Sequence, residues 1–450
     1  MTSLFTFLFL LFTAVAQAIS SSGSRLLVVL EDVAEKAQYS KFLSDLEGRG
    51  FEVTYETPKS ESLSLFHLGE RSYDHILFFP TKAKGLGPNL TANLLLKFIN
   101  AEGNILLALS AQKQAPTAVV AALSELDIHL PSERTGLVVD HFNYDTTSAA
   151  EKHDVLLLPT PGALRPGVKD FFSPRHSQWR APCRPSGYWP APSTAYSYNP
   201  KEEAEALGDD LFAAGKQLSL VTTVQARNSA RLTVLGSADM LNDQWFDAKV
   251  TTVGGKAAVA TVNREFAKRV TGWTFNEIGV LRVNWIEHHL NEEGQGNQSN
   301  PKIYRIKNDV TYSISMSEYE WDHWTAFKVP ASDDLQLEFS MLSPFHRLSL
   351  KPTVSSEDST TYSTSFKLPD QHGIFNFKIN HKRPFFNNIE EKNTVSVRHF
   401  AHDEWPRSYA ISGAWPWIAG IGATVTGWSF FVAIWLFSKP TGKGESKKTR

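Results

Sequence analysis

Cysteine is almost absent from this chain of 450 residues, because Cys183 is the only one. One cysteine cannot close a disulfide within the chain, which excludes the disulfide-rich scaffolds of many secreted domains. Cys183 could pair with a second chain, but its proline-rich surroundings favour a buried, unreactive thiol that can be replaced. The fold must therefore be held together by hydrophobic cores and by contacts with partners.

A large net charge and the familiar catalytic motifs are missing as well. The chain has 45 Lys and Arg against 47 Asp and Glu, and this balance does not favour nucleic acid as a partner. No Gly-x-Ser-x-Gly elbow and no His-Glu-x-x-His pair occurs, so neither motif indicates a hydrolase. His399, His402, Asp403 and Glu404 match no metal-site spacing, and we interpret them as solvated residues beside a membrane. The sequence thus predicts no catalytic, cofactor-binding or metal-binding residue.

The glycine fingerprint of nucleotide-binding sheets is also absent. The first predicted strand is followed by Glu31-Asp32-Val33-Ala34, and anionic side chains at that turn would repel a phosphate. The glycine-rich stretch 84–88 lacks the Gly-Lys-Ser/Thr of a phosphate-binding loop. A bound nucleotide is therefore not expected.

One long apolar run does occur, over residues 415–437, and it contains no charged side chain. A helix of this length spans roughly 34 Å, enough for a hydrocarbon core of about 30 Å. The tail 438–450 carries five basic residues against Glu445, and basic flanks stay in the cytosol. The run predicts a transmembrane helix with most of the chain on the other side.

The N-terminus agrees with this orientation. An apolar run from Leu4 to Val15 precedes Ala16-Gln17-Ala18, which is typical of a signal peptide cleaved after Ala18. The segment before the run has no Lys or Arg, so a retained signal anchor is the alternative. Both interpretations place the residues after this segment in a non-cytosolic compartment, and cleavage makes the chain a single-pass type I membrane protein with its bulk lumenal.

Strand and helix patterns alternate in the first part of the chain. Short apolar runs at 25–31, 75–80, 104–110 and 154–159, separated by helical patterns, predict an α/β fold with a mostly parallel sheet. Strands at 217–225 and 231–241 should extend or flank this sheet, and residues 262–290 read as helical with a break near Thr271. From Asn300 onward, alternation with period two predicts an antiparallel β-sandwich.

These patterns divide the chain into eight segments. We predict a signal peptide (1–18), a lumenal α/β domain (19–160), a proline-rich connection (161–204), a second lumenal α/β region (205–298), a lumenal β-sandwich (299–402), a juxtamembrane segment (403–414), the transmembrane helix (415–437) and a cytosolic tail (438–450).

Several short motifs suggest modification, sorting or recognition. Asn89 and Asn297 open Asn-x-Ser/Thr sequons, although Asn89 could instead cap a helix. Lys447 and Lys448 stand four and three residues from the C-terminus, the arrangement that coat proteins read to return cargo to the endoplasmic reticulum. The acidic and aromatic stretch 318–324 could stack on a sugar, but an interface or an edge-strand patch is the better interpretation, since Trp and Tyr are enriched at interfaces.

The predicted membrane helix has small side chains along one face. They are Ala419, Gly420, Ala423, Thr424 and Gly427. Close backbone approach drives helix association in lipid, so a smooth face favours a partner helix. The alternative is that glycine is simply common in membrane helices.

Long stretches of the chain resemble one protein family. They include VQARNSARLTVLGSADML, GVLRVNWIEHH, YRIKNDVTYSI, EFSMLSPFHRLSL, GIFNFKINHKRPFF, TVSVRHFAHDEWPRSY and ISGAWPWIAG, with weaker similarity at LLVVLED and HDVLLLPTPGALRPG. The chain is similar to the 48 kDa subunit of eukaryotic oligosaccharyltransferase, in its fungal form. Residues 175–190 depart from the family pattern, which leaves their role open.

The resemblance implies a non-catalytic subunit, required for assembly and stability of the complex that glycosylates nascent proteins at Asn-x-Ser/Thr. Catalysis would belong to a separate polytopic subunit, and the chain would also contact a ribophorin II-like subunit and small membrane subunits. Contact with the dolichol-linked donor is left open. A lectin-like cargo receptor and a lumenal α/β hydrolase are the alternatives from other classes.

Overall fold

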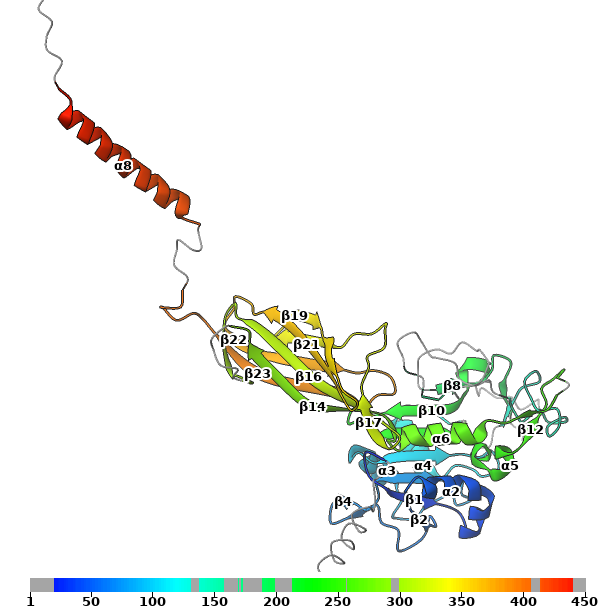
Figure 1. The fold of residues 1–450 in the computed structure, drawn as a ribbon. Coiled ribbons are helices and arrows are strands. Elements are labelled where there is room, and N and C mark those ends of the chain that lie inside the picture. The colour runs from blue at the N-terminus through cyan, green and yellow to red at the C-terminus, as the bar shows by residue number, and fades with distance from the viewer. Residues whose placement is uncertain are drawn as a thin grey trace, which may run out of the picture.

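The structure is a computed structural model that describes residues 20–130, 137–157, 169, 171–172, 188–198, 213–255, 257–292, 299–405 and 413–439. These residues form an α/β lobe, a β-sandwich lobe and a separate C-terminal helix (Figure 1).

The α/β lobe is built on one seven-stranded sheet in the order β2-β1-β5-β6-β11-β10-β8. Its strands are β1 (Arg25–Val29), β2 (Glu52–Glu56), β5 (His75–Phe78), β6 (Asn104–Ala108), β8 (Tyr188–Pro190), β10 (Ser219–Gln225) and β11 (Arg231–Leu235). The first five positions in the order pair in parallel, and β10 and β8 add an antiparallel edge. This confirms the predicted mostly parallel sheet and its extension by later strands.

Helices cover both faces of this sheet, which explains why its central strands are apolar throughout. Leu26 and Val28 of β1 join a core with α2 (Ser40–Gly48) and α6 (Asn263–Thr274). Leu27 and Val29 join the opposite core, with α3 (Ala92–Asn100) and α4 (Thr117–Glu125). Shorter helical turns complete the lobe: η1 (Val33–Tyr39), η3 (Gly215–Gln217), η4 (Ala238–Leu241) and α5 (Asp243–Phe246).

Three two-stranded ribbons lie outside the large sheet. They pair β3 (Phe66–His67) with β4 (Glu70–Arg71), β7 (Leu137–Val139) with β9 (Tyr196–Tyr198), and β12 (Lys249–Val250) with β13 (Val259–Ala260).

The sandwich lobe consists of two five-stranded sheets. One contains β14 (Ile278–Leu290), β16 (Asp309–Glu320), β17 (His323–Ala326), β20 (Lys351–Ser355) and β21 (Thr360–Lys367); the other contains β15 (Ile303–Arg305), β18 (Gln336–Ser340), β19 (Pro344–Ser349), β22 (Gly373–His381) and β23 (Ile389–Arg398). All pairs are antiparallel except β15 with β23. The prediction of an antiparallel β-sandwich is confirmed.

Two predicted elements differ in the structure. The helical reading of residues 262–290 was wrong beyond α6, because Ile278–Leu290 is strand β14 and pairs with β16 along its length. The predicted strand 154–159 was also wrong over its described part, where Leu156 makes only an isolated bridge to Tyr144. The sheet position beside β6 is taken instead by β11, from much later in the chain.

The C-terminal helix α8 (Trp415–Phe437) is long and apolar enough to cross a membrane. None of its residues is buried against the rest of the described chain. A wholly apolar, unburied surface of this length needs lipid or other membrane helices around it.

Candidate functional site: a buried joint between two lobes

The crevice where ligands usually bind in an open α/β sheet lies outside the carboxyl ends of β1 and β5, at the switch in strand order. In this protein the charged side chains at that edge are already paired with other groups of the chain. Glu31 accepts a hydrogen bond from the backbone of Lys82, and Lys113 Nζ lies 2.6 Å from Glu35 Oε1. Asp32 caps the following helical turn by accepting from Ala34 N at 3.1 Å. This acidic, internally paired edge is unsuited to a phosphate.

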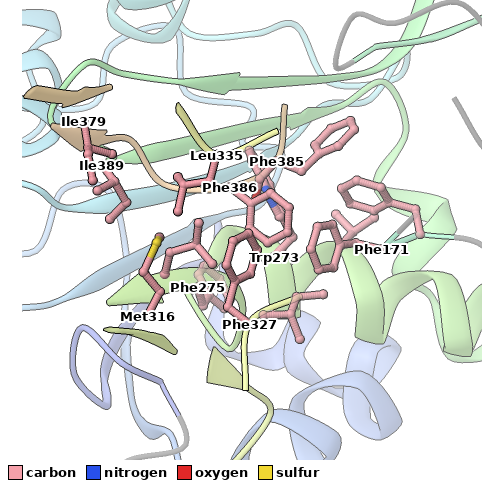
Figure 2. Close-up of a cluster of buried hydrophobic side chains, with 14 of the residues drawn as sticks. Phe171, Trp273, Phe275, Met316, Phe327, Leu335, Ile379, Phe385, Phe386 and Ile389 are labelled. Atoms are coloured by element: carbon pink, nitrogen blue, oxygen red, sulfur yellow. The ribbon is translucent and has the colours of Figure 1, made fainter. Parts of the chain in front are cut away.

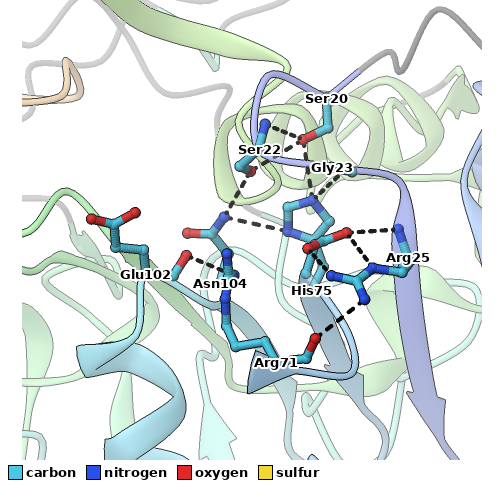
Figure 3. A network of polar contacts seen from close by, with 9 residues as sticks. Ser20, Ser22, Gly23, Arg25, Arg71, His75, Glu102 and Asn104 are labelled. Atoms are coloured by element: carbon cyan, nitrogen blue, oxygen red, sulfur yellow. Dashed lines mark hydrogen bonds and ion pairs between the residues drawn. The ribbon is translucent and has the colours of Figure 1, made fainter. Parts of the chain in front are cut away.

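A serine and a histidine do meet in the α/β lobe, and they test the hydrolase alternative (Figure 3). Ser20 Oγ lies 3.1 Å from His75 Nε2, but it donates its hydrogen to the Phe275 carbonyl at 2.6 Å. The other ring nitrogen of His75 faces the amide of Asn104 at 3.3 Å. The neighbouring Asp74 carboxylate binds Arg25 instead.

This group lacks what a nucleophile needs: an exposed hydroxyl, a free base and a carboxylate that orients the base. Ser20 and His75 are buried, and burial lowers the pKa of His75 to about 4. The contacts instead attach the segment after residue 19 to the lobe, since Ser21 N also donates to the Asn276 carbonyl at 3.1 Å. The arrangement is a structural hydrogen-bond network that holds the N-terminal segment in place, and it is not a catalytic triad.

Buried neutral histidines predict loss of stability in acid. Burial lowers the pKa of His75, His288 and His381 to about 4, so each binds a proton in the unfolded chain before it does so in the folded one. Glu277 and Glu318 oppose them, because burial raises the pKa of both carboxyl groups, that of Glu277 to about 7. The three histidines outnumber these two carboxyl groups, so the free energy of unfolding should fall by about 1–3 kcal/mol per pH unit as pH falls from about 6 toward 4.

Urea unfolding of the full chain in detergent at pH 7, 6 and 5 measures this effect. We expect the midpoint to fall most steeply between pH 6 and 5. A midpoint that stays constant, or rises, over that interval would contradict the burial of these imidazoles as neutral groups.

The strongest polar feature of the molecule is Arg231, which joins the two lobes. It is fully buried at the start of β11. Its guanidinium donates to the carbonyl oxygens of Trp273 and Ile278 at 2.6 and 2.8 Å, and to that of Gly279 at 2.6 Å. Burial lowers its pKa to about 9. One side chain of the α/β sheet thus fixes both the end of α6 and the first residues of β14.

Gly279 is required at this crossing. Its φ is +69°, and a Cβ there would lie 2.7 Å from the Phe385 carbonyl oxygen. Any other residue would therefore be strained and would push the sandwich away from the α/β lobe.

Buried aromatic side chains, among them Trp273, Phe385 and Phe386, pack together at the same joint (Figure 2). Trp273 Nε1 donates to the Phe385 carbonyl at 2.8 Å, and the Trp273 ring packs edge-on against that of Phe385. Phe172 packs against both of these rings, and Phe171 packs against Phe386. These side chains belong to one hydrophobic core that continues from β1 of the sheet into the sandwich strands. The joint is therefore a continuous core, not a flexible linker.

The motif at 318–324 contributes to the same joint. Trp321 lies beside α6, close enough that a Cβ on Gly272 would be 2.9 Å from its ring, and Lys268 Nζ sits 4.9 Å from that ring's centroid. Glu318 is buried and paired with Lys169 at 2.6 Å. Much of the motif thus holds the β16–β17 hairpin in place.

Trp324 belongs to the same motif and points elsewhere. The guanidinium of Arg282 covers its ring at 3.9 Å, and Tyr319 packs against it. A sugar stacking on Trp324 would have to compete with Arg282 for the ring face.

The second buried ionisable group at the joint is Glu277, which links α2 to the end of α6. Arg49 Nη1 lies 2.6 Å from Glu277 Oε2, and Arg49 Nη2 donates to Thr271 Oγ1 at 2.8 Å. Sequence patterns indicated neither this pair nor Arg231. A charged residue at the start of an apolar strand gives the same sequence pattern whether solvent or a second lobe lies beside it in the folded protein.

The predicted site residues are distributed as follows. Ala18, Cys183, Asn297, Lys447 and Lys448 lie outside the described residues. Asn89 is half-buried and donates to the Ser60 carbonyl at 3.5 Å. The cap of α3 is Thr91, the third residue of that sequon, which accepts from Leu94 N at 3.3 Å.

Glu404 of the predicted juxtamembrane group pairs with Arg398 and Arg305. Within the described ranges no three His, Cys, Asp or Glu side chains come together in a way that could hold a metal ion.

The small face of α8 is open in the structure. Ala419, Gly420, Ala423, Thr424 and Gly427 are all exposed. The hydroxyl of Thr424 donates to the Gly420 carbonyl at 2.8 Å, so it presents its methyl group rather than a free donor.

Two family models cover almost the whole chain. One, described as OST48, N-terminal domain, matches residues 17–183 and 189–277; the other, the OST48 middle domain, matches residues 288–439.

Curated relatives match over comparable lengths. The dolichyl-diphosphooligosaccharide–protein glycosyltransferase subunit wbp1 of Schizosaccharomyces pombe is 34% identical over 89% of this chain and 90% of its own. The WBP1 subunit of Saccharomyces cerevisiae is 30% identical over 94% of each chain, and the 48 kDa subunit of Danio rerio is 30% identical over 95% of each.

The fold and the joint define a class of membrane-anchored protein with two lobes fixed to each other by a shared core. With the family models and relatives matching nearly end to end, the chain belongs to the OST48/WBP1 family.

Proposed function

We propose that the chain is a non-catalytic subunit of oligosaccharyltransferase that braces the complex from the lumenal side of the endoplasmic reticulum membrane. The observation that carries the proposal is the match to glycosyltransferase subunits over 89–95% of this chain. Its partners would be the catalytic subunit, a ribophorin II-like subunit and small membrane subunits.

The geometry supports a bracing role. The shared core and the Arg231 contacts make the two lobes one body, so a partner bound to one lobe is positioned relative to the other. The Ser20–His75 pair is buried and lacks a carboxylate, which argues against the hydrolase alternative. The type I orientation is supported by the basic tail.

Affinity purification of the complex by a tag on the full-length chain tests this proposal. A tag inserted between Gly444 and Glu445 leaves the last residues and the N-terminus unchanged. We expect a polytopic glycosyltransferase and small membrane proteins to co-purify, with transfer activity in the complex but not in the isolated chain. Activity of the isolated chain, or recovery of the chain alone from mild detergent, would refute it.

The C-terminal lysines give a separate prediction about location. With Lys447→Ser and Lys448→Ser, we expect the unassembled chain to escape and acquire Golgi-type glycans at an occupied sequon. Lys439→Ser with Lys443→Ser removes the same charge, keeps the motif and should have no effect. The measurement is the addition of Golgi-type sugars to the chain's glycans, read from slower electrophoretic migration of the chain. Unchanged migration of the unassembled first variant would contradict a retrieval role for the two lysines.

A further inference from the structure

Exposed aliphatic side chains gather at one end of the sandwich. Ile303 of β15 and Ile374 of β22 lie level on one face, because both pair with Ser396 of β23. They are 60% and 64% exposed. Leu342 is 99% exposed in the turn after β18, at the same end, since Ser340 pairs with Asn376 of β22. We call Ile303, Ile374 and Leu342 the apolar end row.

The chain leaves the sandwich toward α8 from this same end (Figure 1). β23 ends at Arg398, two residues beyond Ser396. The segment that follows is held against the end of the sheet, because Glu404 pairs with Arg398 at 2.8 Å and with Arg305 at 3.6 Å. The exit point to the membrane helix thus lies within the row's own sheet.

Trp405 completes the group on this exit segment. It is 54% exposed and packs against Phe400 with ring centroids 5.3 Å apart. Trp415, the first residue of α8, is ten residues further along the chain, and ten Cα-to-Cα steps span at most about 33–36 Å. This end of the sandwich is therefore tethered close to the membrane that holds α8.

We propose that the apolar end row and Trp405 contact the bilayer surface beside α8 and insert into its interfacial region. Three aliphatic tips and one tryptophan are too few for a stable protein interface, which takes about 20–30 residues a side. The same side chains suit the boundary between headgroups and acyl chains, where Trp concentrates and apolar side chains are buried. With α8 as a second attachment, this contact fixes the tilt of both lobes over the membrane. The inference needs only that α8 lies in the membrane, and it goes beyond membership in a complex.

Photo-crosslinking in native membranes tests the contact with the full chain in its natural assembly. The photoreactive residue p-benzoylphenylalanine is placed at Leu342 or at Ile374, and phospholipid adducts are identified by mass spectrometry. The matched control site is Val354 of β20, which is 65% exposed but pairs with Thr361 toward the opposite end of the sandwich. We expect phospholipid adducts at the first two sites and none at Val354.

Three results would overturn the proposal: adducts to another protein at Leu342 and Ile374, no adducts there, or equal lipid adducts at Val354. A second variant separates contact from chance proximity. Leu342→Ser with Ile374→Ser should leave folding unchanged, as surface substitutions do, while lipid adducts from a probe at Ile303 decline. Undiminished adducts at Ile303 would show that the row does not act together.

Discussion

Replacing Arg231 with methionine is expected to separate the two lobes and destabilise the protein by about 3–5 kcal/mol. Methionine fills much of the space but donates no hydrogen bond. The carbonyl groups of Trp273, Ile278 and Gly279 would then stay buried without their donor, and each such group costs about 1–3 kcal/mol. The variant no longer has the cost of removing a charged guanidinium from water, and this gain offsets part of the loss of stability.

Chymotrypsin digestion of the full chain in detergent gives a readout specific to the joint. Phe275, between α6 and β14, is buried in the wild type and should become cleavable in Arg231→Met, which would release the two lobes as separate fragments. Arg231→Lys should recover only part of the stability, because one ammonium cannot replace a planar fork with donors in several directions.

The control for Arg231 is Arg347→Met. Arg347 is 65% exposed and paired with Glu338, so its loss should change the stability by less than about 0.5 kcal/mol. If Arg231→Met unfolds at the same urea concentration as Arg347→Met, the guanidinium does not hold the joint.

The double replacement Ala423→Leu with Gly427→Leu is expected to release the chain from its partners without unfolding it. Both positions are exposed on α8, with no other atom near the place of a Gly427 side chain, so the folded chain has room for both leucines. A partner helix in close contact would clash, at a cost of about 1–3 kcal/mol by analogy with overpacked cores. That weakens association roughly 5- to 150-fold.

Co-purification in mild detergent measures this effect, with membrane insertion checked by carbonate extraction. The matched control is Val425→Leu with Ser429→Leu, which has the same spacing but lies about half a turn around the helix. Both variants should insert, since leucine favours the membrane. If the two variants recover equal amounts of the partners, α8 only anchors the chain and does not contribute to assembly.

Local patterns were sufficient to predict α8 and the alternation of buried and exposed residues in sandwich strands such as β22 and β23. Twenty-three residues without charge form a helix that is long and apolar enough to cross a membrane, a property that length and composition alone decide. The continuous apolar runs of β1, β5 and β6 likewise report burial on both faces of a parallel sheet. In these elements each residue's own chemistry agrees with its final environment.

Only the tertiary structure decided the features that join distant parts of the chain. Residues 278–290 contain helix-compatible spacing, yet pairing with β16 makes them a strand, because sheet hydrogen bonds with a distant partner outweigh weak local preference. Arg231 is an ordinary strand-end charge in the sequence, and it becomes the centre of the joint only when Ile278 and Gly279 of the sandwich strand β14 approach it. The apolar end row has the same origin: Ile303, Ile374 and Leu342 are far apart in the chain, and sheet register alone brings them together.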